Sequence, residues 1–88
     1  MNPHYRIRVD TLAREIAGEL VLVNVASDKI FVANQTGARL WRGIEAQCDL
    51  PALIADITAM APAPPAAREE VNDFIAALLR EGFIEDLG

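Results

Sequence analysis

The side chains that could carry chemistry are few and far apart in this 88-residue sequence. Its only histidine, His4, lies in a polar and basic N-terminal stretch, and no other histidine exists to activate its only cysteine, Cys48. A thiol needs such a neighbour to become a reactive thiolate, so Cys48 is better interpreted as a small buried hydrophobe. Ser27 and Asp28 are adjacent, and a turn explains both of them. We therefore expect no catalytic residue.

The short motifs that bind metals or phosphate groups are also missing. The sequence has no glycine-rich phosphate loop and no HExxH or CxxC pattern. A single cysteine excludes an internal disulfide and a cysteine-based metal cage. Glu69 and Glu70 are consecutive, so on a helix their carboxylates point in different directions. These features predict a protein that is not an enzyme and that has no cofactor and no metal.

Length and composition predict one small domain with an aliphatic core. The 88 residues are 52% hydrophobic but only 6% aromatic. A single thiol fits a reducing compartment. No charged-then-apolar leader stands at the N-terminus, and no apolar run approaches the roughly 18 residues of a membrane span. We expect a soluble, cytoplasmic protein that does not bind membranes.

Charge is spread unevenly along the chain. Residues 1–42 carry six Lys and Arg against four Asp and Glu, or +2, whereas residues 43–88 carry two against nine, or −7, which together give the net charge of −5. Affinity for nucleic-acid backbones rests on basic side chains, so the acidic half would be repelled by phosphate. We expect no nucleic-acid partner.

The first half of the sequence predicts a three-stranded antiparallel meander. Residues 19–25 are apolar and β-branched and lie between Gly18 and a turn-like stretch, which favours a strand. Residues 25–28 can close a hairpin to a second short strand at 29–33, and residues 12–17 form a further strand that turns back at Gly18. Residues 1–11 precede this domain of residues 12–88 as an N-terminal arm, either loose or as a short extended segment.

The hydrophobic period then changes from two to about 3.6 residues, which predicts three helices. Asp49 or Leu50 can cap the second helix with Pro51 in its first turn, and a Pro-rich stretch at 61–65 precedes the third. Gly82 can end the third helix before an extended tail. The apolar faces are Gly37, Leu40, Trp41, Ile44 and Cys48; then Leu50, Leu53, Ile54, Ile57 and Met60; then Val71, Phe74, Ile75, Leu78 and Leu79. Strands followed by helices predict an α+β domain, winged-helix-like in content.

This architecture allows three kinds of function. An exposed strand at 29–33 could pair with an extended peptide, and the apolar face of the third helix could form one wall of a groove beside it; the simpler interpretation is that this face is all core. A small winged-helix DNA-binding transcriptional regulator is the alternative, but only Arg68 and Arg80 lie between residues 50 and 82, among five acidic residues. A homodimer that pairs its exposed edges is a third possibility.

The string ELVLVNVASDKIFVANQTGARLW resembles the PqqD-like family, also called RiPP recognition elements. Its Asn34, Thr36, Gly37 and Trp41 match an Asn-x-Thr-Gly-x-x-x-Trp element of that family. The later strings LPALIADI and VNDFIAALLREGFIE resemble the second and closing helices. The resemblance covers roughly residues 12–86. One departure is the Val-Ala pair at residues 32 and 33, where many relatives have Gly or an aromatic residue followed by Leu.

The resemblance implies a winged-helix-like, non-catalytic protein that binds the leader of a ribosomally made precursor peptide and presents it to a modifying enzyme. The leader would add as a strand beside the third strand and pack against the third helix. The enzymes would be a leader peptidase and cyclase of the lasso-peptide type, which we favour, or a radical enzyme of quinone cofactor maturation. The domain would be a monomer or a weak homodimer. Carried over by position, the peptide-binding residues are Lys29, Ile30, Phe31, Val32 and Ala33 on the strand and Val71, Phe74, Ile75 and Leu78 on the closing helix.

On this interpretation the stretch NQTGARLW supports the site and does not contact the ligand. Asn34 or Thr36 would cap the first helix. Gly37 would let the first turn press close to the sheet, where a side chain would intrude. Leu40 and Trp41 would anchor the helix in the core.

Overall fold

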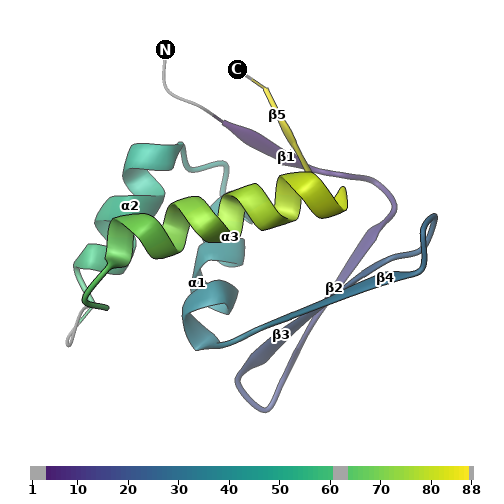
Figure 1. The fold of residues 1–88 in the computed structure, drawn as a ribbon, viewed down its shortest axis with the longest axis horizontal. Helices are drawn as coiled ribbons and strands as arrows, with labels where there is room; N and C mark the ends of the chain where they lie inside the picture. Colours follow the sequence, from purple (N-terminus) through teal and green to yellow (C-terminus); the bar gives the residue numbers. More distant parts are fainter. Residues whose placement is uncertain (1–3, 61–63, 88) are drawn as a thin grey trace.

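The computed structural model of the protein describes residues 4–60 and 64–87. In chain order the elements are β1 (Tyr5–Ile7), β2 (Thr11–Ile16), β3 (Glu19–Asn24), β4 (Lys29–Ala33), α1 (Gln35–Glu45), α2 (Leu50–Thr58), α3 (Ala67–Glu81) and β5 (Ile84–Asp86) (Figure 1). Strands β2, β3 and β4 form an antiparallel sheet in that order, and the three helices follow. The predicted α+β, winged-helix-like arrangement is confirmed.

Two tight turns fix the register of the sheet. Ile16 is opposite Glu19, so Ala17 and Gly18 form a two-residue turn, and both have positive φ (52° and 82°). The twist of a two-residue turn with positive φ at both positions matches the right-handed twist of the strands on either side of it. The β3–β4 turn is closed by Asn24, whose Oδ1 accepts hydrogen bonds from the backbone N–H groups of Ala26 and Ser27 at 2.9 and 3.1 Å. Its Nδ2 donates to the carbonyl of Gly82 at 3.1 Å, which ties the hairpin to the end of α3.

The helices begin and end at capping residues that the sequence indicated. Asn34 accepts a hydrogen bond from the Gly37 N–H at 3.1 Å at the start of α1, and Asp49 accepts one from the Ala52 N–H at 3.0 Å at the start of α2. Gly82 has a φ of 81° and ends α3 in the left-handed conformation.

Two residues that were predicted on helix faces lie beyond the helix ends. Because α1 stops at Glu45, Cys48 lies in the following turn, where its N–H donates to the Gly43 carbonyl at 3.0 Å. Met60 likewise follows the end of α2. Both side chains are partly buried and pack against the core, so they contribute apolar contact from turns.

Part of the predicted N-terminal arm is a strand. β1 pairs antiparallel with β5, with Tyr5 opposite Asp86 and Ile7 opposite Ile84. The Tyr5 side chain is only 8% exposed and belongs to the core. Of the two forms considered for this segment, the short extended one is present at residues 5–7. Residues 1–3 lie outside the described ranges, and the boundary between residues 11 and 12 stays a prediction.

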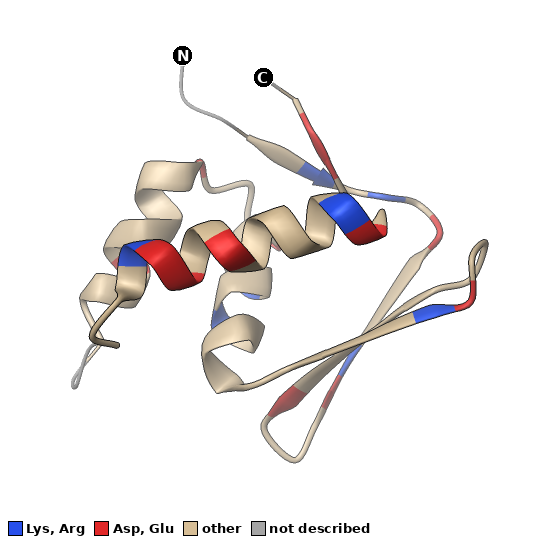
Figure 2. Cartoon of the chain, viewed as in Figure 1, with Lys and Arg blue, Asp and Glu red and all other residues tan. Residues whose placement is uncertain are grey.

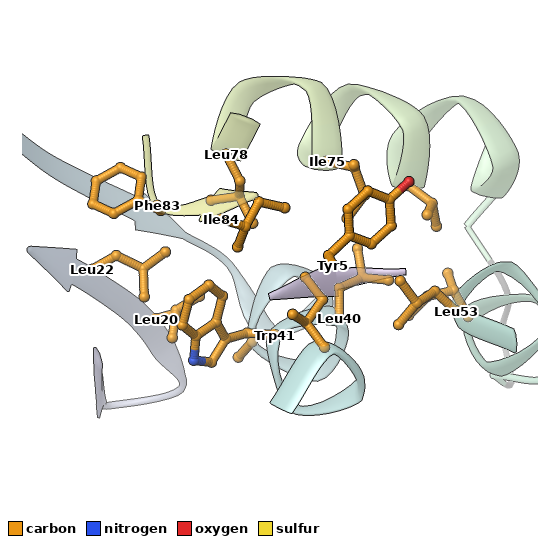
Figure 3. Packing of buried hydrophobic residues seen from close by; sticks show 14 of the residues in the cluster. Tyr5, Leu20, Leu22, Leu40, Trp41, Leu53, Ile75, Leu78, Phe83 and Ile84 are labelled. Carbon is orange, nitrogen blue, oxygen red and sulfur yellow. The ribbon is translucent and has the colours of Figure 1, made fainter. Parts of the chain in front are cut away.

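The core lies between one face of the sheet and the three helices (Figure 3). Its side chains come from all layers: Leu20 and Leu22 from β3, Leu40 and Trp41 from α1, Leu53 from α2, Ile75 and Leu78 from α3, and Phe83, Ile84 and Tyr5 from the C- and N-terminal segments. The opposite face of the sheet is uncovered and exposes Leu12, Ile16, Ile30 and Val32. None of the helices in the described ranges is long and apolar enough to cross a membrane.

Candidate peptide-binding site

The open edge of β4 is the first feature of the candidate site. In the order β2-β3-β4, β4 pairs with β3 on one side only, and its other side pairs with no strand in the part of the chain that the structure describes. In an antiparallel edge strand, alternate residues direct their backbone N–H and C=O groups outward. The five residues Lys29–Ala33 therefore offer a template for one more strand.

Helix α3 lies beside this edge and is connected to β4 at two points. Near the β3–β4 turn, Lys29 Nζ lies 2.9 Å from the Glu81 carboxylate. In the middle of the strand, the ring of Phe31 makes an edge-to-face contact with Phe74 at a centroid distance of 5.9 Å. Phe31 also packs on Phe83 at 6.1 Å. These contacts hold the edge of β4 alongside α3.

At the Ala33 end of β4 the surface is hollowed. The hollow has a volume of about 340 Å³ and is open to solvent. It lies near the lower limit of about 300 Å³ for small-molecule pockets. Its lining comes from the end of β4, the first turns of α1 and the first half of α3: Val32, Ala33, Asn34, Thr36, Gly37, Leu40, Glu70, Asp73 and Phe74. The hollow therefore adjoins the strand edge where an added peptide would run.

Of the four helix residues predicted to bind peptide, Phe74 lines this hollow. Val71, Ile75 and Leu78 are 0%, 4% and 0% exposed and lie in the core. Their spacing of four and three places them on the buried stripe of α3, whereas Phe74 lies beside that stripe and is partly exposed. The five strand residues all lie on β4: Phe31 and Ala33 point toward the core, and Lys29, Ile30 and Val32 are exposed.

Several lining residues were missed by the sequence reasoning. Gly37 lies so close to β4 that an added Cβ would stand 2.5 Å from the Cβ of Ala33 and 3.1 Å from Cε1 of Phe74. The paired small residues Ala33 and Gly37, four positions apart at the strand–helix junction, were the signal available. The stretch NQTGARLW thus contributes Asn34, Thr36, Gly37 and Leu40 to the hollow itself, in addition to capping α1.

Acidic side chains give the hollow its charge. Glu70 and Asp73 line it, and neither forms an ion pair with a residue in ranges 4–60 and 64–87. Figure 2 shows the acidic stretches along the first half of α3. At the other end of the helix, the hydrogen bond from Lys29 lowers the pKa of Glu81. This favours the ionised form of that carboxylate, whose charge is paired with the Lys29 ammonium group.

The two arginines of α1 are engaged elsewhere. Arg39 donates two hydrogen bonds to the Asp56 carboxylate on α2, at 2.8 and 2.9 Å, and the pKa of Asp56 is lowered as a result. Arg42 pairs with Glu15 on β2. Both arginines therefore lie on the surface, and each pairs with a neighbouring carboxylate.

The residues first considered for catalysis do not form a constellation. His4 precedes β1, Ser27 lies in the β3–β4 turn and Cys48 lies between α1 and α2. Within the described ranges, no group of three or more His, Cys, Asp and Glu side chains is placed to hold a metal ion.

The comparisons with known proteins agree with this geometry. The family model described as coenzyme PQQ synthesis protein D (PqqD) matches residues 19–84. The chain belongs to the PqqD family. The matched segment contains the whole of β4 and all three helices, so it includes every residue of the candidate site in this PqqD family chain. The resemblance carried by the Asn-x-Thr-Gly-x-x-x-Trp element is confirmed.

A solved structure described as TbiB1 in complex with the TbiA(beta) leader peptide has a similar fold. Its TM-score is 0.81 at 22% sequence identity, and the match covers 91% of this chain and 94% of that chain. At this identity the likeness shows a shared fold. No curated protein matches the chain.

Proposed function

We propose that this PqqD family chain is a non-catalytic RiPP recognition element that binds the leader of a ribosomally made precursor peptide by strand addition at β4. The observation that carries the proposal is the unpaired edge of β4 beside a hollow that α3 helps to line. Main-chain hydrogen bonds supply affinity in this mode, and side-chain pockets supply specificity. The fold shared with TbiB1, a protein whose structure was solved with a leader peptide, supports it.

The bound leader is then presented to a modifying enzyme. We propose a leader peptidase and cyclase of the lasso-peptide type, acting in the cytoplasm, where a reducing environment suits the free thiol of Cys48. A radical enzyme of quinone cofactor maturation is the alternative, because the family serves both systems. The reading frames beside the gene distinguish them: a peptidase and a cyclase support the first, and a radical enzyme supports the second.

The test is a binding titration with synthetic leaders encoded by the short reading frames that flank the gene. Fluorescence anisotropy of the labelled leader is measured as the chain is added. We expect one of them to bind with a dissociation constant in the micromolar range or below. No binding at high micromolar concentration contradicts the proposal.

A proline scan of residues 30–32 separates strand addition from other modes. Proline removes a backbone donor, and only the variants whose N–H pointed away from β3 should keep the fold. We expect those folded variants to lose leader binding. The matched control is the same scan at residues 12–14 of β2, the other edge of the sheet, where folded variants should bind normally. A folded β4 variant that binds like the wild type would exclude strand addition.

The two rival functions have their own assays. A DNA-binding regulator would shift duplex DNA in a salt-dependent way. We expect no shift, because α3 carries Glu69, Glu70, Asp73 and Glu81 against two arginines. A homodimer through paired edges would raise the mass seen by light scattering as concentration increases, whereas we expect a monomer or at most weak association.

A further inference from the structure

We infer that the hollow at the Ala33 end of β4 selects leader peptides that place a lysine or arginine side chain in it. The aliphatic stem of that side chain would lie against Phe74 and Leu40, and its cationic head would lie between Glu70 and Asp73. This inference rests on the proposed function and adds a chemical preference to the same site.

The lining of the hollow has an apolar part and a charged part. Phe74, Leu40 and Ala33 supply hydrocarbon surface, and Gly37 adds no side chain that would fill the space. Lysine and arginine bury a hydrocarbon stem while keeping a charged head near water. A hollow that is open to solvent and about 340 Å³ in volume fits that division. A purely apolar side chain would form no ion pair with the two exposed carboxylates of the rim, Glu70 and Asp73.

Helix geometry explains one of the two carboxylates but not the other. Glu70 lies in the first turn of α3, where the helix dipole stabilises acidic residues, as it does for Glu69. Asp73 lies beyond the first turn, where that effect has faded. Both carboxylates are exposed to water, and neither forms an ion pair within the described ranges.

No basic side chain of the described chain serves as the missing partner. None of the residues that line the hollow is a lysine or an arginine. Arg39 is bound to Asp56 and Arg42 to Glu15. Arg68, at the start of α3, lines a different hollow with Leu50, Pro51 and Ile54 of α2. A cation from a bound peptide would complete the charge pattern.

The charge pattern also gives the groove a direction. At the β3–β4 turn, Lys29 neutralises Glu81, whereas at the Ala33 end Glu70 and Asp73 are unmatched. The basic residue of a leader therefore belongs at the Ala33 end, and an acidic residue there would meet two like charges.

The experiment selects displayed random peptides on the wild-type chain and on a Glu70→Gln/Asp73→Asn double variant. We expect wild-type selections to enrich lysine or arginine at one aligned position and the double variant to lose that enrichment. One selected peptide is then synthesised with its basic residue and with methionine in its place. The basic peptide should bind the wild type about three- to ten-fold more tightly than the methionine peptide, an advantage that high salt reduces.

A control variant shows whether the preference for the basic peptide depends on the two carboxylates that line the hollow. Glu69→Gln removes the same charge from the same helix turn, but Glu69 does not line the hollow, so it should retain the preference for the basic peptide. The double variant should bind the basic and the methionine peptides equally.

The possible failures point to different claims. If peptides bind at β4 but show no basic preference, the inference is wrong and the proposed function stands. The same holds if the double variant lowers the affinity for both peptides by the same factor, so that the preference for the basic peptide persists. If neither selected peptides nor leaders from the flanking reading frames bind β4, the proposed function fails and the inference with it.

Discussion

Replacing Gly37 with alanine tests whether α1 must approach β4 as closely as the structure shows. The added Cβ would stand 2.5 Å from the Cβ of Ala33, a separation that real Cβ atoms essentially never show. The Ala33 Cβ is attached directly to the β4 backbone, so the clash is relieved only if the strand or the helix moves. Phe74, at 3.1 Å, must shift as well.

The expected cost follows from two opposing terms. Overpacking of this kind costs about 1–3 kcal/mol. Alanine in place of glycine within a helix recovers about 0.5–1 kcal/mol. We therefore expect Gly37→Ala to lower the free energy of unfolding by about 1–2 kcal/mol. For a domain of this size, that corresponds to a fall in Tm of about 4–16 °C.

Gly43 supplies the matched control within the same helix. A Cβ there would also stand 2.5 Å from its nearest neighbour, but that atom is Cδ2 of Leu53, the far end of a flexible side chain. A change of rotamer costs about 0.5–1.5 kcal/mol, which the helix gain largely offsets. The free energy of unfolding of Gly43→Ala should thus lie within about 1 kcal/mol of that of the wild type.

Urea unfolding followed by far-UV circular dichroism measures both variants at an unchanged m-value. If Gly37→Ala is as stable as the wild type, or if it loses less stability than Gly43→Ala, the close approach of α1 to β4 is wrong. The explanation of the hollow by the two small residues Ala33 and Gly37 would then also be wrong.

Three further changes test other parts of the structure. Asn24→Ala removes three hydrogen bonds and leaves the Gly82 carbonyl without its donor, so urea unfolding should show a loss of about 2–3 kcal/mol; a loss under about 0.5 kcal/mol would contradict this role. In the same assay, Tyr5→Ala should lower the free energy of unfolding by about 3 kcal/mol and Tyr5→Phe by under about 1 kcal/mol; a Tyr5→Ala variant as stable as the wild type would show that β1 is not part of the core. NMR titration should give Asp56 a pKa below its usual range that rises in Arg39→Met, and an unchanged pKa would exclude the ion pair.

The sign of the Asp56 effect on stability follows from that lowered pKa. The ionised carboxylate is favoured in the folded chain, so its contribution is fully present above the unfolded-state pKa of about 3.9. It is lost as pH falls through the lower folded-state pKa. Because the pair with Arg39 is exposed, the contribution is small and should weaken with salt.

Most of the fold could be predicted because its local signals are strong. The apolar, β-branched run at residues 19–25, the turn at Gly18 and the caps Asn34 and Asp49 each have a local physical cause, and the structure agrees with them. The pairing of β1 with β5 joins residues 79 positions apart in sequence, as from Arg6 to Glu85. No local pattern specifies such a pair, so the sequence alone predicts only an N-terminal arm for residues 1–11.

The site was predictable only in outline. Residues 29–33 were identified as the strand whose edge is open, but helical periodicity could not separate core residues from groove residues on α3. Val71 and Phe74 are both apolar and differ only in their angle around the helix axis, which depends on how α3 lies against β4. The sequence does not indicate that Glu70 and Asp73 line the site, because their place beside Ala33 depends on tertiary packing.

Amide hydrogen exchange on the chain, with and without a leader from the flanking reading frames, tests strand addition most directly. The leader should slow exchange at alternate residues of β4, the ones whose N–H groups are not bonded to β3, by more than about tenfold. The outer edge of β2 should be unchanged. Protection of β2 in place of β4, or binding without any protection of β4, would contradict the account.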